Sequence, residues 1–109
     1  MGTTKSDKFT KEQNEVAEMA KALGHPARIA ILQYLATQES CVCGSIVEEV
    51  GLAQATVSQH LKALKEAGFI QGSVDGVSMC YCINTAHINK VNGLLSSLLS
   101  SCCSLNTCC

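Results

Sequence analysis

Apolar residues recur at helical spacing in two stretches near the start of the chain. In residues 12–23 the inward positions are Val16, Met19, Ala20 and Leu23, spaced i, i+3, i+4 and i+7. In residues 27–36 the inward positions are Ile29, Leu32 and Leu35. Gly24-His25-Pro26 interrupts the pattern, and Pro26 suits the first turn of a new helix. The pattern predicts two amphipathic helices after a polar N-terminus over residues 1–11.

The stretch from residue 53 to residue 68 has two different faces. Val57, Leu61 and Leu64 recur at i, i+4 and i+7, so one face of a helix is apolar. The opposite face is small, polar and partly basic, as a helix in a DNA major groove requires. Residues 43–50 predict a short preceding helix and residues 51–53 a tight turn, which together indicate a helix-turn-helix. The predicted DNA contacts are Gln54, Thr56, Ser58, Gln59, His60, Lys62 and Lys65.

An ordinary helical hairpin would show the same two-faced pattern, but a β-hairpin follows this one. The extended segment from Phe69 to Val74 leads to Asp75-Gly76, a strong signal for a two-residue turn. Residues 77–83 then alternate with the period of a strand. One face carries Val77, Met79, Tyr81 and Ile83, and the other carries Ser78, Cys80 and Cys82. The predicted fold class is mainly α with a small β-hairpin, a winged helix-turn-helix.

The last predicted helix has a long apolar stripe. Asn84 or Thr85 can cap its N-terminus. The stripe consists of Ile88, Val91, Leu94, Leu95, Leu98 and Leu99. So small a domain offers this stripe few partners, which predicts packing against the first helix and against a second copy of the chain in a homodimer. The predicted domain spans residues 12–101, and residues 102–109 form a cysteine-rich tail.

The composition fits one packed domain. The chain has 109 residues, of which 47% are hydrophobic and 4% aromatic, so aliphatic side chains must build the core. No apolar run approaches the roughly 20 residues that span a membrane. No basic-then-apolar leader opens the chain, so we expect a cytoplasmic protein without membrane contact. The net charge of −1 predicts modest, strongly salt-dependent DNA binding.

Eight cysteines are the largest anomaly of the composition. In a secreted miniprotein this number would indicate a disulfide framework. Here the helical pattern provides a core without crosslinks, which favours a reducing cytosol and thiols that bind metal or sense oxidants. The chain has no Cys-X-X-Cys, no nucleophile–base constellation and no phosphate loop. We therefore expect no enzyme and assign no catalytic residue.

Four segments form a recognisable set. Ala22–Leu32 reads Ala-Leu-Gly-His-Pro-Ala-Arg-Ile-Ala-Ile-Leu, Ser40–Gly44 reads Ser-Cys-Val-Cys-Gly, Thr56–Leu64 reads Thr-Val-Ser-Gln-His-Leu-Lys-Ala-Leu, and Cys80–Ile83 reads Cys-Tyr-Cys-Ile. Together they resemble the ArsR/SmtB family of metal-responsive repressors, over residues 15–99. The resemblance implies a homodimer that binds palindromic operator DNA and leaves it when metal binds.

Two positions depart from the pattern of that family. Many relatives carry an Arg just after the hairpin glycine, where this chain has Val77. The arsenic-type signature often has a third Cys three residues after its second, where this chain has Ile46. The first departure weakens the expectation that the wing contacts DNA. The second leaves Cys41 and Cys43 one ligand short of the three that a trivalent arsenic centre needs.

The predicted metal ligands are Cys41, Cys43, Cys102, Cys103, Cys108 and Cys109. The first two fall at the predicted start of a helix, where thiol pKa is lowered and thiolates, the ligands of soft ions, form readily. The other four form a Cys-Cys-X4-Cys-Cys tail. This tail could bind As(III) or Sb(III) by itself, or it could supply the missing third ligand to Cys41 and Cys43. Cd(II) and Zn(II) are less favoured. Cys80 and Cys82 are interpreted as half-exposed strand residues, and His87 as a surface residue.

Two other functions stay open on the sequence alone. One is a thiol redox or persulfide sensor of the same fold, with Cys43 pairing with a cysteine of the tail. The other is a metal-sequestering protein that has no operator.

Overall fold

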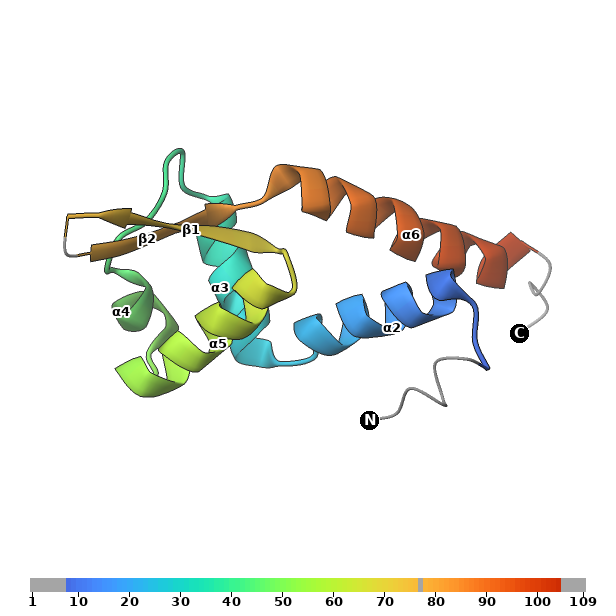
Figure 1. The fold of residues 1–109 in the computed structure, drawn as a ribbon, viewed down its shortest axis with the longest axis horizontal. Helices are drawn as coiled ribbons and strands as arrows, with labels where there is room; N and C mark the ends of the chain where they lie inside the picture. Colours follow the sequence, from blue (N-terminus) through green and yellow to red (C-terminus); the bar gives the residue numbers. More distant parts are fainter. Residues whose placement is uncertain (1–7, 77, 105–109) are drawn as a thin grey trace.

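The computed structural model describes residues 8–76 and 78–104 of the chain. Its elements are α2 (Lys11–Leu23), α3 (Pro26–Ala36), α4 (Ile46–Val50), α5 (Gln54–Glu66), β1 (Ile70–Asp75), β2 (Ser78–Ile83) and α6 (Thr85–Ser104). Figure 1 shows α3, α4, α5 and the β1–β2 hairpin gathered at one end of the molecule. From there α2 and α6 run side by side toward the other end and contact each other. The predicted winged helix-turn-helix is confirmed.

Local signals in the sequence set most helix ends. Thr10 caps α2 by accepting a hydrogen bond from the Gln13 amide at 3.0 Å, and the Gln13 side chain accepts one from the Thr10 amide. Pro26 occupies the first turn of α3. Beyond α5, Gly68 has a φ of 93°. A glycine adopts this conformation at little energetic cost because it has no Cβ. This glycine turns the chain from the helix straight into the hairpin.

The core lies where α3, α5 and the hairpin meet. Its most completely buried large side chains are Phe69, Ile31, Leu64, Ile70 and Val57, each below 2% exposed. The apolar face predicted for α5 is confirmed, because Val57, Leu61 and Leu64 are all buried.

The inward faces of α2 and α3 were partly mispredicted. Ile29 is 39% exposed, and the buried residues of α3 are Ile31 and Leu35. In α2, Ala20 is exposed whereas Ala22 is buried. Most positions around the circumference of α3 carry apolar residues, so spacing alone does not select the face of α3 that packs against α5.

The hairpin turn falls one residue later than predicted. β1 and β2 pair antiparallel with Asp75 opposite Ser78, so residues 76 and 77 connect them. Gly76 has a φ of 68°, and Val77 lies outside the described residues. A further segment joins this sheet at β2, because Val42 forms an antiparallel bridge with Tyr81. Each residue's amide donates to the other's carbonyl at 2.8 Å.

The last helix is longer than predicted. Asn84 caps it by accepting a hydrogen bond from the His87 amide at 3.3 Å. The helix continues to Ser104, past the predicted domain end at residue 101, and so includes Cys102 and Cys103. Cys108 and Cys109 lie outside the described residues. No described helix is both long enough and apolar enough to cross a membrane.

Candidate nucleic-acid interface and thiol site

The polar face of α5 lies open to solvent. Its exposed residues are Gln54, Ala55, Thr56, Ser58, Gln59, Lys62, Lys65 and, at the C-terminal end of the helix, Glu66. Behind them, Val57 and Leu64 anchor the helix in the core with 1% and 0% exposure. A helix fixed on one side with small hydrogen-bonding groups on the other can enter a major groove and reach base edges.

His60 differs from these neighbours because its side chain turns toward α3. Arg28 Nε donates a hydrogen bond to His60 Nδ1 at 3.1 Å, and Arg28 also donates to the Ala22 carbonyl at 3.1 Å. The His60 ring lies 5.4 Å from that of His25. Burial, then the charges of Arg28 and His25, lower the pKa of His60 below its usual value of 6.5. His60 therefore holds α5 against α3 rather than extending from the exposed face.

Four cysteines lie opposite one another across two extended segments. Cys41 faces Cys82 and Cys43 faces Cys80, one pair on each side of the bridge between Val42 and Tyr81. The structure joins both pairs as disulfides, with Cα–Cα distances of 4.5 Å and 4.1 Å. Such short separations are typical of the non-hydrogen-bonded positions of an antiparallel pair, where side chains approach closely. We call these four residues the facing cysteines.

This arrangement corrects two expectations and places one further residue. The helix that was predicted to start at Cys43 begins at Ile46, so no helix N-terminus acts on Cys41 or Cys43. Cys80 was taken as half-exposed but is only 4% exposed. Ile46, where relatives carry a third Cys, is a core residue with 3% exposure. The signal that could have revealed the pairing is the repetition of Cys-X-Cys, because the outer residues of two such motifs on antiparallel strands face each other.

The segment of Cys41 and Cys43 lies next to the exposed helix. Cys43, Tyr81 and Ser58 all line a hollow of about 460 Å³ between the hairpin, α4 and α5. At the far end of the segment, the Tyr34 and Ser45 hydroxyls are hydrogen-bonded at 2.7 Å. The Cys41–Cys43 segment is therefore adjacent to the hairpin, to the start of α4 and to the exposed face of α5.

Cys102 and Cys103 do not join this group. Both are exposed near the end of α6, which Figure 1 places at the opposite end of the molecule from the hairpin. Within one chain they therefore do not supply the missing ligand to Cys41 and Cys43. Across residues 8–76 and 78–104, no group of three or more His, Cys, Asp or Glu side chains is arranged to hold a metal ion.

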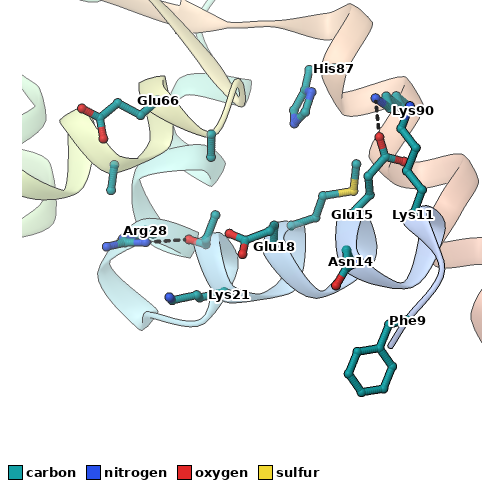
Figure 2. Close-up of a pocket in the computed structure, with 14 residues that line it drawn as sticks. Phe9, Lys11, Asn14, Glu15, Glu18, Lys21, Arg28, Glu66, His87 and Lys90 are labelled. Atoms are coloured by element: carbon teal, nitrogen blue, oxygen red, sulfur yellow. Dashed lines mark hydrogen bonds and ion pairs between the residues drawn. The ribbon is translucent and has the colours of Figure 1, made fainter. Parts of the chain in front are cut away.

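A larger cleft of about 1070 Å³ lies between α2, α5 and α6. Figure 2 shows charged side chains of both signs around it, and Lys90 Nζ lies 3.6 Å from Glu15 Oε2. His87 packs edge-on against Phe69 beside this cleft, with ring centroids 4.9 Å apart, and its Nε2 is buried. The prediction that His87 is a surface residue was wrong, because the start of α6 rests on the core. The mixed charges select no single class of ligand.

Comparison with known proteins relates this chain to regulators of transcription. Residues 25–71 match the model of a family described as "Bacterial regulatory protein, arsR family". The chain is 36% identical over 85 residues to an HTH-type transcriptional regulator of Methanocaldococcus jannaschii, an alignment that covers 77% of this chain and 94% of that one. It is 38% identical over 74 residues to the HTH-type transcriptional repressor SmtB of Mycobacterium tuberculosis, covering 68% and 54%. A homodimeric winged helix-turn-helix DNA-binding domain of Mycobacterium bovis shares the fold, with a TM-score of 0.63 at 24% identity over 98% of this chain and 93% of that one.

Proposed function

Because the chain belongs to the ArsR/SmtB family of transcriptional regulators, we propose that it binds palindromic operator DNA as a homodimer and is released by As(III) or Sb(III). Proteins of this family are DNA-binding regulators and not enzymes. The observation that carries the proposal is the position of the thiol segment, which shares a hollow with the exposed face of α5. An inducer bound there acts directly beside the DNA-reading helix.

The proposed dimer uses the end of the molecule formed by α2 and α6. Leu98 and Leu99 are 45% and 62% exposed on α6. Val16 and Leu94 line a groove between the two helices that continues to Leu98. A second copy packed on this surface would bury the exposed leucines. Two α5 helices related by a two-fold axis then fit half-sites one helical turn apart, and this geometry requires a palindrome.

On the operator, the exposed residues of α5 divide by chemistry. Gln54, Thr56, Ser58 and Gln59 carry groups that hydrogen-bond to base edges or position the helix. Lys62 and Lys65 supply positive charge for phosphates. With a slightly acidic chain and two lysines per reading helix, we expect the affinity to fall steeply as salt is added.

For the inducer, the facing cysteines supply the thiolates in their reduced state. As(III) and Sb(III) are soft ions that select sulfur ligands. Cys41 and Cys43 provide two, and Cys80 or Cys82 on β2 must move toward them to provide the third, because the described side chains form no ready group of three. Cd(II) and Zn(II) remain less favoured. Differential binding of 1–3 kcal/mol between two dimer geometries, the usual scale of allosteric coupling, is enough for release.

Fluorescence anisotropy on a labelled fragment of the protein's own promoter tests this function. In reducing buffer, As(III) and Sb(III) should release the DNA at lower concentrations than Cd(II) or Zn(II). Cys41→Ser/Cys43→Ser should bind DNA but no longer respond. The matched control Cys102→Ser/Cys103→Ser changes two exposed thiols at the other end and should respond like the wild type. Release that survives in the first variant and fails in the second would place the sensor in the tail.

A further inference from the structure

The facing cysteines form two separate pairs rather than one group of four. Within each pair the Cα atoms are 4.5 Å or 4.1 Å apart. Alternate residues along one strand lie farther apart, at roughly 6.6 Å. Cysteines that face each other across the two segments are therefore closer than the two cysteines of one segment. The backbone pairing of Val42 with Tyr81 holds the facing cysteines in place.

We propose that the facing cysteines are a thiol–disulfide switch that responds to hydrogen peroxide. Oxidation joins Cys41 to Cys82 and Cys43 to Cys80, and the crosslinked protein binds its operator more weakly. This inference rests on the proposed operator binding and adds a second input to it. The structure pairs Cys43 with Cys80, not with the tail cysteine that the sequence had suggested for a redox sensor.

The exposure of the four residues separates their roles. Cys41 and Cys43 are exposed, whereas Cys82 is half-buried and Cys80 is buried. An oxidant in solution reaches Cys41 and Cys43 first. Cys82 and Cys80 then lie in position to resolve the oxidised sulfur before it proceeds to irreversible acids.

The reaction balances for each pair. The exposed thiolate attacks one peroxide oxygen, the O–O bond breaks, and the leaving hydroxide takes up a proton to become water. The resulting sulfenic acid is attacked by the facing thiol, so that the S–S bond forms and the second oxygen leaves as water. Each pair loses two electrons and two protons and consumes one peroxide. A dithiol reductant reverses the change by thiol–disulfide exchange.

The crosslinks reach the DNA-reading helix through two elements. β2 pairs with β1, which contacts α5, and the Cys41–Cys43 segment leads through Gly44 into α4, which also contacts α5. Disulfides fix these two segments to each other, as an As(III) ion bridging the same thiols would. Since both inputs join the same segments, both should weaken operator binding.

The test measures crosslinks and DNA binding in the same samples of the full chain. Reduced protein is treated with hydrogen peroxide, remaining thiols are alkylated, and peptides are mapped by mass spectrometry while anisotropy reports affinity for the promoter fragment. We expect Cys41–Cys82 and Cys43–Cys80 peptides, an affinity roughly 5- to 150-fold lower, and recovery with dithiothreitol. Crosslinks to other cysteines, or the expected crosslinks with unchanged affinity, would overturn the switch.

Variants keep the two proposals apart. Cys80→Ala/Cys82→Ser should lose the response to peroxide, and circular dichroism checks that it folds, because Cys80 is buried. Cys82→Ser alone keeps three thiols for As(III) and should still release DNA with As(III), while forming only the Cys43–Cys80 crosslink. A peroxide response that persists in the double variant contradicts the switch. If the reduced wild type binds no promoter DNA, the proposed function is contradicted. The peptide map needs no DNA and therefore tests the cysteine pairing independently.

Discussion

The two ends of this molecule use cysteine in different ways. At the hairpin end, four cysteines lie on extended segments and meet in pairs across them. At the end of α6, Cys102 and Cys103 are adjacent on a helix and both exposed. Neighbouring residues on a helix point about 100° apart, so such thiols diverge, whereas facing residues on antiparallel strands converge. The secondary structure around a cysteine, more than its spacing in sequence, decides which thiols can act together.

The largest expected effect comes from separating the dimer at the α6 end. Leu98→Asp/Leu99→Asp places charges on the exposed leucines and should yield monomers in analytical ultracentrifugation. Operator affinity should then fall by about 100-fold or more, because the two half-sites no longer bind as one linked unit. Pairing of the facing cysteines should be unchanged in the same variant. A monomer with wild-type affinity would contradict the proposed dimer.

Next in size is the response to inducer in Cys41→Ser/Cys43→Ser. We expect the loss of the whole 5- to 150-fold release by As(III), since the two exposed thiolates are removed. Titration by anisotropy measures it. Full release in this variant would show that the hairpin end is not the sensor.

Reduction of the facing cysteines should also lower stability. The crosslinks span 41 and 37 residues, and closing one loop of this size contributes about 2–4 kcal/mol to the free energy of unfolding. The second loop lies within the first, so it should add less than the first. Urea unfolding of oxidised and reduced protein measures the difference. Cys102→Ser/Cys103→Ser should show the same difference as the wild type, and any decrease would implicate the α6 end.

The smallest expected effect concerns pH and the link between α3 and α5. Because the pKa of His60 is lowered in the folded protein, its neutral form contributes stability above pH 6.5 that is lost as pH falls through the lower, folded-state pKa. A proton on Nδ1 also removes the hydrogen bond from Arg28. Between pH 7.5 and 5.5 we expect the free energy of unfolding to decrease by less than the roughly 1 kcal/mol that a single hydrogen bond contributes. His60→Gln keeps an acceptor but does not titrate, so its urea midpoint should change less over this range; an equal change would rule out His60 as the cause.

Much of the fold followed from periodicity in the sequence. Val57, Leu61 and Leu64 gave the buried face of α5, and the alternation after Gly76 gave β2. Periodicity failed where nearly every residue is apolar, as in α3, because Ile29 and Ile31 can each face inward until a neighbouring helix selects one. It also failed at the start of α4, where the bridge between Val42 and Tyr81 and the positive φ of Gly44 delay the helix until Ile46.

Less of the thiol site could be predicted. The exposed polar residues of α5 could be predicted from one short stretch of sequence, because they all lie on the same helix. The cysteine pairs join residues 37 and 41 positions apart, and local patterns carry no information about which distant strands meet. Cys80 was therefore assigned to an outer face, although the Cys41–Cys43 segment covers it.

The central claim is that the thiols at the hairpin end control operator binding. Replacement of Cys102, Cys103, Cys108 and Cys109 by Ser leaves the facing cysteines as the only thiols of the chain. Anisotropy of this reduced variant on the promoter fragment, titrated with As(III), is the most direct measurement. The account predicts release equal to that of the wild type, roughly 5- to 150-fold in affinity. A variant that binds the operator but does not respond to As(III) would contradict it.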